Sequence, residues 1–452
     1  MIENYLCRTA CGITLNFEKQ DVSFETFQAL MAHGKRIGLI EKYQSMCNGA
    51  VVNKSEGRAA LHTALRDFRD CSLHHAEVSE VLNKMFDFAR AVRNGDWRGA
   101  SNDRISDVIN VGIGGSDMGP KAVWQALRPI KPEINLHFLS AADGISYERI
   151  TENLNPFTTL VVVSSKSFKT VETLANARAI DQWFFNAGIC GEARQRHMVV
   201  ASANQEATSQ LGLPQDNLFP FWEWVGGRFS VWGSVGLPLV VGLGPEIFMD
   251  FLSGAHGMDM HTSEASIESN LPAIMALLAF QNITKSKMLS YCWLPYDERL
   301  RGIVPWLQQL EMESLGKTPF NAEHLTGARV WGGHGNESQH SFYQWLRAGT
   351  GNTAIDVCWC ENPGHAQKEL HKLLISSAKA QVEALTNRDN KNYRNVISTL
   401  CLDALTPARL GALMAMYEHK TTMLGTLFGI NPFDQPGVEF GKKLTLKLLE
   451  SN

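Results

Sequence analysis

Short apolar runs alternate with amphipathic stretches along most of the chain after residue 107. Runs at 108–113, 159–163 and 197–201 are rich in Val or Ile and carry no Asp, Glu, Lys or Arg. Runs of this length and composition predict buried β-strands. The stretches between them repeat apolar residues at helical spacing. Alternating strands and helices indicate an α/β fold, with parallel sheets flanked by helices on both faces.

The alternation falls into two blocks, at 101–230 and at 285–428, which we expect to be two α/β domains. A helical connection over 231–284 lies between them, and the sequence shows no low-complexity linker. We therefore expect the domains to pack closely with a site between them, at the carboxyl ends of the strands. The remaining predicted strands are 136–139, 288–294, 328–331, 353–359 and 395–402. The clearest predicted helices are 171–187, 299–313, 337–348, 365–386 and 406–428.

The two ends of the chain differ from these blocks. Residues 1–100 show apolar residues at helical spacing, and we expect them to form an N-terminal helical layer around the rest of the chain. Residues 429–452 pass through Gly437 and Gly441 into a Lys-rich helix and are treated as a separate C-terminal segment. Residues 1–100 show no chemistry by themselves that exceeds packing.

Composition narrows the class of protein. The 452 residues are 44% hydrophobic and 19% charged, which is typical of a globular protein with large cores. The formal net charge is −4 and no basic block occurs, which argues against nucleic-acid binding as the main function. The longest uncharged stretch, 229–245, is short and rich in Gly and Pro, so no membrane span is expected.

Two further features concern the compartment. The first five residues lack the pattern of a secretory signal, and nine cysteines are scattered without pairing. Cys358 and Cys360 have no second pair or His cluster near them at zinc spacing, so we expect reduced thiols and no metal site. These features predict a cytoplasmic protein.

Two Gly- or Ser-rich turns follow predicted strands. Gly112-Ile-Gly-Gly-Ser-Asp117 fits neither the GxGxxG nor the GK[ST] pattern, which leaves an anion-binding turn or a plain tight turn. Ser164-Ser-Lys-Ser-Phe-Lys-Thr170 brings hydroxyls and a lysine to a helix N-terminus. That arrangement suits a phosphate monoester, and ordinary N-capping is the alternative.

The stretch from Gln309 to Lys317 contains the strongest candidate for catalysis. Glu311 and Glu313 lie two apart at the end of a predicted helix, so they do not share a face, and one of them can enter a pocket as a general base. Arg228 follows a glycine pair and can face an oxyanion, or it can be a surface residue of a turn.

Two other polar loops hold candidates with plain alternatives. His340 lies near the start of a predicted helix and can transfer a proton near neutral pH, although most helix histidines are structural. Gln435 and Lys442 occur in the C-terminal segment, where a solvated lysine is the alternative.

Together these segments resemble the glucose-6-phosphate isomerase (phosphoglucose isomerase) family from about residue 105 to 443. The resemblance rests on motifs that occur in the family's order: Gly112-Ile-Gly-Gly-Ser-Asp-Met-Gly-Pro120, Ser165-Lys-Ser-Phe-Lys-Thr-Val-Glu-Thr173, Val225-Gly-Gly-Arg-Phe-Ser230, Gln309-Leu-Glu-Met-Glu-Ser-Leu-Gly-Lys317, Ser338-Gln-His340, Gly411-Ala-Leu-Met-Ala-Met-Tyr-Glu-His-Lys420 and Asp434-Gln-Pro-Gly-Val-Glu-Phe-Gly-Lys442.

The resemblance implies two sugar-isomerase (SIS) domains and reversible interconversion of glucose 6-phosphate and fructose 6-phosphate, a step of glycolysis and gluconeogenesis. It implies no metal or organic cofactor. Glu313 would move the proton between C2 and C1, Arg228 would stabilise the cis-enediolate, and Glu311 would face solvent. His340, donated across a homodimer, and Lys442 would aid ring opening. The residues implied in substrate binding are Gly115, Ser116, Ser165, Lys166, Ser167, Thr170, Gly227, Gln309 and Gln435.

Two other classes of function fit the chain less well. A sugar-phosphate-binding module without catalysis needs the Ser-rich turn but not Glu313. A nucleotide-dependent enzyme is disfavoured because the chain lacks both nucleotide-binding patterns.

Overall fold

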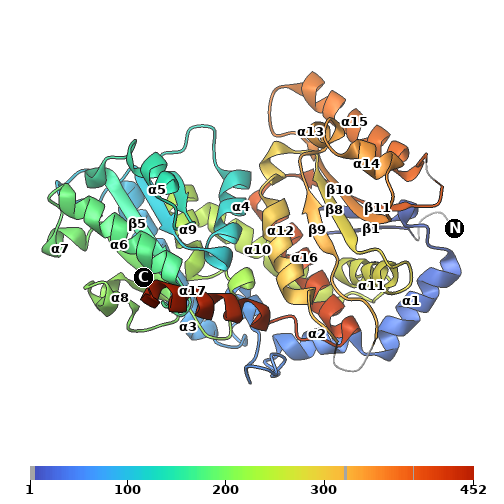
Figure 1. Cartoon of the computed structure of the whole chain (residues 1–452), viewed down its shortest axis with the longest axis horizontal. Helices are drawn as coiled ribbons and strands as arrows, with labels where there is room; N and C mark the ends of the chain where they lie inside the picture. The colour runs from blue at the N-terminus through green and yellow to red at the C-terminus, as the bar shows by residue number, and fades with distance from the viewer. Residues whose placement is uncertain (1–5, 320–322, 390, 452) are drawn as a thin grey trace.

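The computed structural model describes residues 6–319, 323–389 and 391–451. It confirms the α/β class, with two sheets in two halves that lie side by side (Figure 1). The first sheet is parallel throughout, in the order β4-β3-β5-β6-β7. Its strands are β3 (Asp107–Val111), β4 (Asn135–Leu139), β5 (Thr159–Ser164), β6 (Met198–Ser202) and β7 (Leu218–Pro220).

Helices cover both faces of the first sheet because its strands are apolar on both sides. Every residue of β5 and β6 is buried. The helices of this half are α3 (His75–Asn94), α4 (Met118–Leu127), α5 (Gly144–Thr151), α6 (Val171–Asn186), α7 (Gly191–Arg194), α8 (Ala207–Gln210) and α9 (Leu237–Leu243). The shift from β-branched runs to amphipathic stretches therefore predicted this half well.

The second sheet has the order β1-β2-β11-β10-β8-β9. Strands β8 (Ser290–Pro295), β9 (Arg329–Gly332), β10 (Thr353–Asn362) and β11 (Asn395–Ala404) are parallel, as predicted. The helices that follow them are α12 (Ile303–Leu315), α13 (Gly335–Gln339), α14 (Tyr343–Ala348), α15 (Lys368–Thr386) and α16 (Pro407–Phe428).

The N-terminal region is mainly helical, as predicted, but it also contains two strands that were not predicted. Strands β1 (Cys7–Ala10) and β2 (Ile13–Asn16) form a hairpin whose turn, Cys11 and Gly12, has positive φ at both positions. β2 extends the second sheet by antiparallel pairing with β11. The stretch around residue 62 forms only the 3-10 helix η2 (His62–Arg66). The expected helices α1 (Phe24–Arg36), α2 (Leu39–Cys47) and α3 are present.

One continuous apolar core joins the two halves. It includes Val108 and Leu160 of the first sheet together with Trp293 and Leu400 of the second. The connection contains α10 (Pro245–Glu264) and α11 (Leu271–Thr284), and α10 packs along α16. The expected close packing of the domains is therefore observed. Within the described ranges, no helix combines the length and apolar character of a membrane span.

Candidate active site

Four segments that are distant in the sequence meet between the two sheets. The turn after β3 includes η3 (Gly114–Ser116) and lies against η6 (Gly227–Phe229). A Cβ added to Gly115 would come within 2.2 Å of the carbonyl group of Gly227. A Cβ added to Gly114 would lie 3.2 Å from Gln309 Nε2 on α12. The loop after α16 completes the group through bonds to Arg228.

The end of α12 carries the predicted base. Gln309 Nε2 donates a hydrogen bond of 3.2 Å to Glu313 Oε2 across one helical turn. Arg228 Nη1 lies 3.3 Å from the same oxygen. The Glu313 side chain is 23% exposed and that of Arg228 only 1%. The carboxylate is therefore partly in contact with solvent, and the cation beside it is buried. Within the described chain Glu313 Oε1 has no hydrogen bond, and this oxygen can accept a proton.

Glu311 does not face solvent, so that part of the prediction was wrong. It is 3% exposed, and its Oε1 accepts a hydrogen bond of 2.7 Å from Lys420 Nζ on α16. Burial raises the pKa of Glu311, and the charge of Lys420 opposes that rise. Residues two apart on a helix point to nearly opposite sides. Glu313 therefore faces Arg228 and solvent, while Glu311 faces the core.

The N–H groups of Arg228 all have partners within the protein. Besides its contact with Glu313, the guanidinium donates to Ser314 Oγ (2.7 Å), Gln435 Oε1 (3.0 Å) and the carbonyls of Pro432 (2.5 Å) and Asp434 (3.1 Å). Burial lowers the pKa of Arg228, and the neighbouring carboxylates oppose the change, so the group stays charged at working pH. The structure thus brings Arg228, Glu313, Gln309 and Gln435 together.

The turn after β5 presents hydroxyl groups at the N-terminus of α6. Ser165 is buried, and its Oγ accepts a hydrogen bond of 3.2 Å from the Phe168 N–H. Phe168 is itself buried at a positive φ of 53°, which fixes the turn. Ser167 is exposed, and Thr170 is the N-cap residue but forms no capping bond. The helix N-terminus and these hydroxyls suit an anion.

Lys166 and Ser116 hold the turns in place. Lys166 Nζ donates to the carbonyls of Glu223 (2.7 Å) and Val225 (2.9 Å), so it ties the Ser-rich turn to the chain before η6. Burial lowers the pKa of Lys166, as does the charge of Arg58. The Ser116 carbonyl accepts a hydrogen bond of 2.9 Å from the Asn110 side chain.

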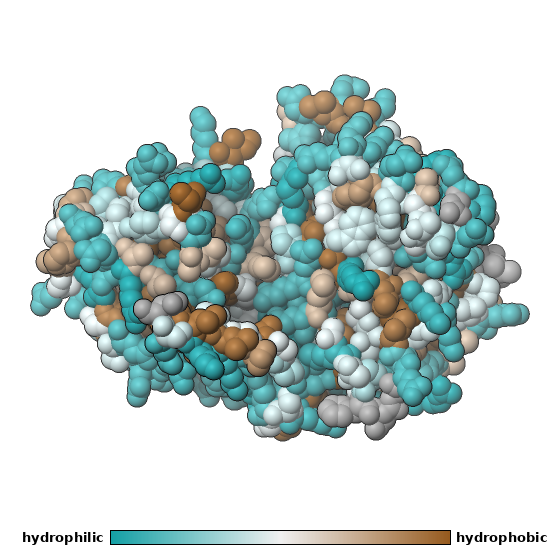
Figure 2. Space-filling model, in the orientation of Figure 1, coloured by the Kyte–Doolittle hydropathy of each residue, from teal (hydrophilic) through white to brown (hydrophobic). Residues whose placement is uncertain are grey.

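His340 and Lys442 lie outside this group. His340 is exposed at the C-cap of α13. Lys442 is exposed on α17 (Glu439–Ser451) and pairs with Glu439 at 2.7 Å. Neither side chain forms a hydrogen bond or ion pair with Glu313 or Arg228 in the part of the chain that is described. No described residue of α17 is buried, and Figure 2 shows its apolar side chains in a row on the surface.

Three residues of the site were not singled out from the sequence. Ser314 binds Arg228, and Lys317 forms an ion pair of 2.7 Å with Asp434. The only signal for them was their position inside the motifs that contain Glu313 and Gln435. Neither of these two motifs indicates from its sequence that its residues contact those of the other motif.

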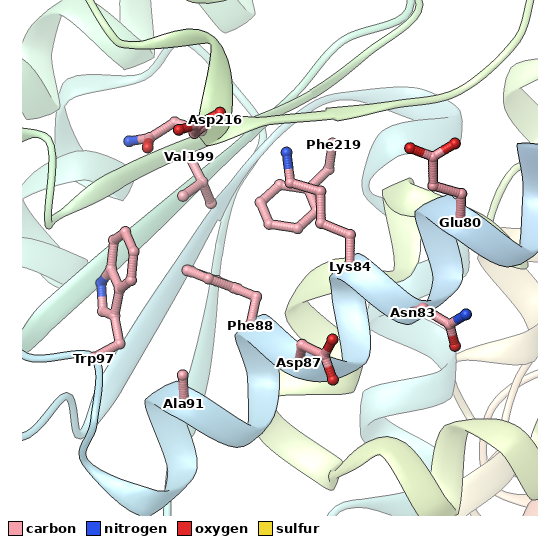
Figure 3. Close-up of a pocket in the computed structure, with 11 residues that line it drawn as sticks. Glu80, Asn83, Lys84, Asp87, Phe88, Ala91, Trp97, Val199, Asp216 and Phe219 are labelled. Atoms are coloured by element: carbon pink, nitrogen blue, oxygen red, sulfur yellow. The ribbon is translucent and has the colours of Figure 1, made fainter.

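A second groove lies between α3 and the strands β6 and β7 (Figure 3). Its volume is about 610 Å³, and Phe88, Trp97 and Phe219 form its walls. Lys84 Nζ donates to the Leu218 carbonyl at 2.8 Å and lies 5.0 Å from the centre of the Phe219 ring. The other charged lining residues are Glu80, Asp87 and Asp216. This acidic lining is unsuited to a phosphate ester, and none of the predicted site residues lies there.

Comparison with known proteins gives one consistent result. A family model described as phosphoglucose isomerase matches residues 16–452. The glucose-6-phosphate isomerase of Burkholderia orbicola (strain MC0-3) is 41% identical over 460 residues, which cover 96% of this chain and 85% of that protein. Glucose-6-phosphate isomerase 1 of Chromohalobacter salexigens is 38% identical over 97% of this chain and 84% of that one. The crystal structure of a glucose-6-phosphate isomerase from Chlamydia trachomatis matches with a TM-score of 0.87 at 28% identity, covering 99% of this chain and 91% of the other.

Proposed function

Because the chain belongs to the phosphoglucose isomerase family and is an isomerase, we propose that it interconverts glucose 6-phosphate and fructose 6-phosphate. The observation that carries this proposal is the setting of Glu313. Gln309 and Arg228 hold one of its oxygens at 3.2 and 3.3 Å at the junction of the two halves. A carboxylate fixed beside a buried cation suits proton transfer next to a carbonyl group.

Glu313 serves as the base in both half-reactions. It removes the proton from C2 of the open-chain aldose, which places the negative charge on O1. After the hydroxyl proton on O2 passes to O1, Glu313 returns its proton to C1 of the cis-enediolate, and the carbonyl group of the ketose forms at C2. Proton transfer next to a carbonyl needs a base and a cation near the oxyanion, and Glu313 and Arg228 supply these groups, so the proposed step uses no metal or organic cofactor. General base catalysis contributes about 10²–10⁴-fold. The rest comes from orientation of the substrate and from the positive charge of Arg228.

Arg228 acts on the enediolate through its charge. Four hydrogen bonds to the protein and the ion pair with Glu313 already engage its guanidinium group, so we assign its effect on the substrate to its positive charge. A fixed cation in a largely dry site still favours the negative charge that forms on the sugar oxygens.

The phosphate binds at the two turns that follow β3 and β5. Ser165, Ser167 and Thr170 offer hydroxyls at the N-terminus of α6, and Ser116 lies in the neighbouring turn. Lys166 adds positive charge and fixes the turn against residues 223–225. The residues next to the sugar are Gly115, Gly227, Gln309 and Gln435. Binding the phosphate at a distance from C1 and C2 orients the open chain for proton transfer.

Ring opening involves His340 and Lys442 in a homodimer, with His340 donated by the partner subunit. Two observations support this part of the proposal. His340 has no bond to the Glu313 cluster among the described residues and is exposed, as a residue that serves a partner's site would be. The apolar side chains in a row on α17 are also exposed, and no other described part of the chain buries them. An exposed apolar patch of this kind suits contact with a partner subunit.

The chemical assignment is tested by the Glu313→Gln variant in an assay that couples fructose 6-phosphate formation to a reporter, with a chelator present. We expect a loss of about 10²–10⁴-fold in kcat with little change in KM. The matched control is Glu148→Gln, since Glu148 is exposed on α5. An inactive wild type, or a Glu313→Gln variant that retains most of its activity, rejects the proposal.

Subunit exchange tests the shared site. The Glu313→Gln and His340→Ala variants are each expected to be inactive. If His340 serves the partner's site, unfolding and refolding them together restores about a quarter of the wild-type activity, because half of the dimers are mixed and contain one intact site. Absence of recovery with intact dimers shows that His340 serves its own subunit or no site.

A further inference from the structure

A buried ion pair joins the back of α12 to the middle of α16. Lys420 Nζ lies 2.7 Å from Glu311 Oε1, and both side chains are only 4% exposed. The same ammonium group lies 4.0 Å from the centre of the Tyr291 ring, a distance that suits a cation–π contact. The proposed chemistry uses neither Glu311 nor Lys420, although burying two charges is costly.

The surroundings of this pair are rigid and polar. Asp356 Oδ2 accepts hydrogen bonds from Tyr291 (2.5 Å) and Tyr417 (2.7 Å), and Tyr417 also accepts one from Trp293 (2.8 Å). A cavity of about 40 Å³ beside the pair is large enough for an ordered water. Lys420 is therefore held in one position.

The middle of α16 is bonded to several other segments of the protein. Its consecutive residues 417–420 point to different sides, because each step along a helix turns by about 100°. Glu418 binds Arg66 and Trp232, and His419 binds Asp259. A group anchored to this part of α16 is thus anchored to η2 and α10 as well.

The pair controls how α12 is rotated about its axis. Glu311 and Glu313 lie about 200° apart, so anchoring Glu311 sets the direction of Glu313. A rotation of about 20° moves a carboxylate at the helix surface by about 2 Å. Apolar contacts such as those of Leu307 and Leu310 are not directional and resist a small rotation weakly. A buried ion pair resists it strongly, because separation leaves two charges without partners.

We propose that Glu311 and Lys420 are positioning residues, which hold Glu313 against Arg228 at the distance that proton transfer requires. This inference rests on the proposed role of Glu313 as the base. A displacement of about 1 Å can lower the rate of such a step by about 10²-fold.

The test is the double variant Glu311→Leu/Lys420→Met, which fills the same space without charge and leaves no charge unpaired. Its melting temperature is expected to stay close to that of the wild type. We expect kcat to fall by at least about tenfold while KM for fructose 6-phosphate changes less than about twofold, since the phosphate turns are untouched. The control Thr262→Val removes a buried hydroxyl on α10, which donates to the Met258 carbonyl and does not contact the Glu311–Lys420 pair, and it is expected to keep the wild-type kcat. A double variant with the wild-type kcat overturns the proposal.

A crystal structure of the double variant gives a readout that does not depend on activity. We expect the separation of Arg228 Nη1 and Glu313 Oε2 to exceed the 3.3 Å of the native contact by about 1 Å or more. An unchanged separation overturns the positioning role even if the proposed isomerase activity fails. If the double variant does not fold, Glu311→Gln replaces it in both measurements, because it keeps a hydrogen-bonding oxygen and the same shape. We then expect a smaller fall in kcat, and an unchanged kcat and separation again reject the role.

Discussion

Lys317 and Asp434 form an ion pair of 2.7 Å that ties the end of α12 to the loop after α16. The other carboxylate oxygen of Asp434 accepts a hydrogen bond of 2.5 Å from Ser55. Two distant segments therefore fix the loop whose carbonyls and Gln435 side chain bind Arg228. The precision of the Arg228–Glu313 contact depends on this loop as well as on α12.

The Asp434→Asn variant is expected to be less stable at neutral pH. Burial alone would raise the pKa of Asp434, but hydrogen bonds from Lys317 and Ser55 and the charges of Lys317 and Arg228 lower it below the usual value. A lowered pKa contributes stability above the unfolded value of about 3.9, which is lost as pH falls through the folded value. The difference in the free energy of unfolding between wild type and variant should therefore be constant from pH 8 to about 5 and shrink below about pH 4.

Urea unfolding at several pH values measures this difference. The control is Asp389→Asn, which removes an exposed ion pair with Arg347 and should change the free energy of unfolding much less. Equal and small effects of the two substitutions would show that the Lys317–Asp434 pair does not hold the loop.

Gly115→Ala should disrupt the contact between the turn after β3 and η6. Its Cβ would lie 2.2 Å from the carbonyl group of Gly227, and backbone on both sides cannot yield as a flexible side chain can. We expect a loss of about 1–3 kcal/mol in stability from overpacking, and a loss of activity of about 10²-fold because η6 carries Arg228. Gly144→Ala is the control, since nothing lies within 4 Å of its added Cβ. Thermal melts and the isomerase assay measure both effects, and a fully active Gly115→Ala variant contradicts the prediction.

The sequence predicted the parallel strands other than β7 (Leu218–Pro220), because their apolar runs are longer than its three residues. β10 and β11 begin at Thr353 and Asn395, as predicted, and each ends a few residues later than expected. The hairpin of β1 and β2 was missed because its strands have four residues each and pair with a strand almost 400 residues away. A local pattern does not contain such long-range pairing.

The orientation of α12 shows the same limit at the site. Helical spacing predicted that Glu311 and Glu313 point to different sides, and family motifs favoured Glu313 as the base. What places Glu311 in the core is Lys420, which lies 109 residues away on another helix. A glutamate is rarely buried unless it is paired with a cation, and the sequence does not reveal which cation that is.

Glu418 is expected to make the stability of the protein depend on pH near neutrality. Burial raises its pKa to about 7, and Arg66 opposes this rise only in part, because it also binds Asp259 through two nitrogens. Between about pH 4.5 and 7, Glu418 therefore carries a proton in the native state but has lost it in the unfolded state. The free energy of unfolding consequently falls as pH rises through this range. Glu418→Gln removes the titrating group and should flatten this slope. Chemical unfolding from pH 5 to 8 measures it, and equal slopes for wild type and variant contradict the raised pKa.

Lys442 provides the sharpest test of the C-terminal segment, because Lys443 is its neighbour on the same exposed helix. Neither lysine is buried and α17 contributes no buried residue, so neither Lys→Met substitution should change the melting temperature. If the Lys442 ammonium donates a proton to the ring oxygen, Lys442→Met should lower kcat/KM for glucose 6-phosphate by about 10²-fold or more. Lys443→Met should leave it within about twofold, the range expected when only a surface charge is lost. Equal effects of the two substitutions would assign α17 a general electrostatic role, and no effect of either would remove Lys442 from the mechanism.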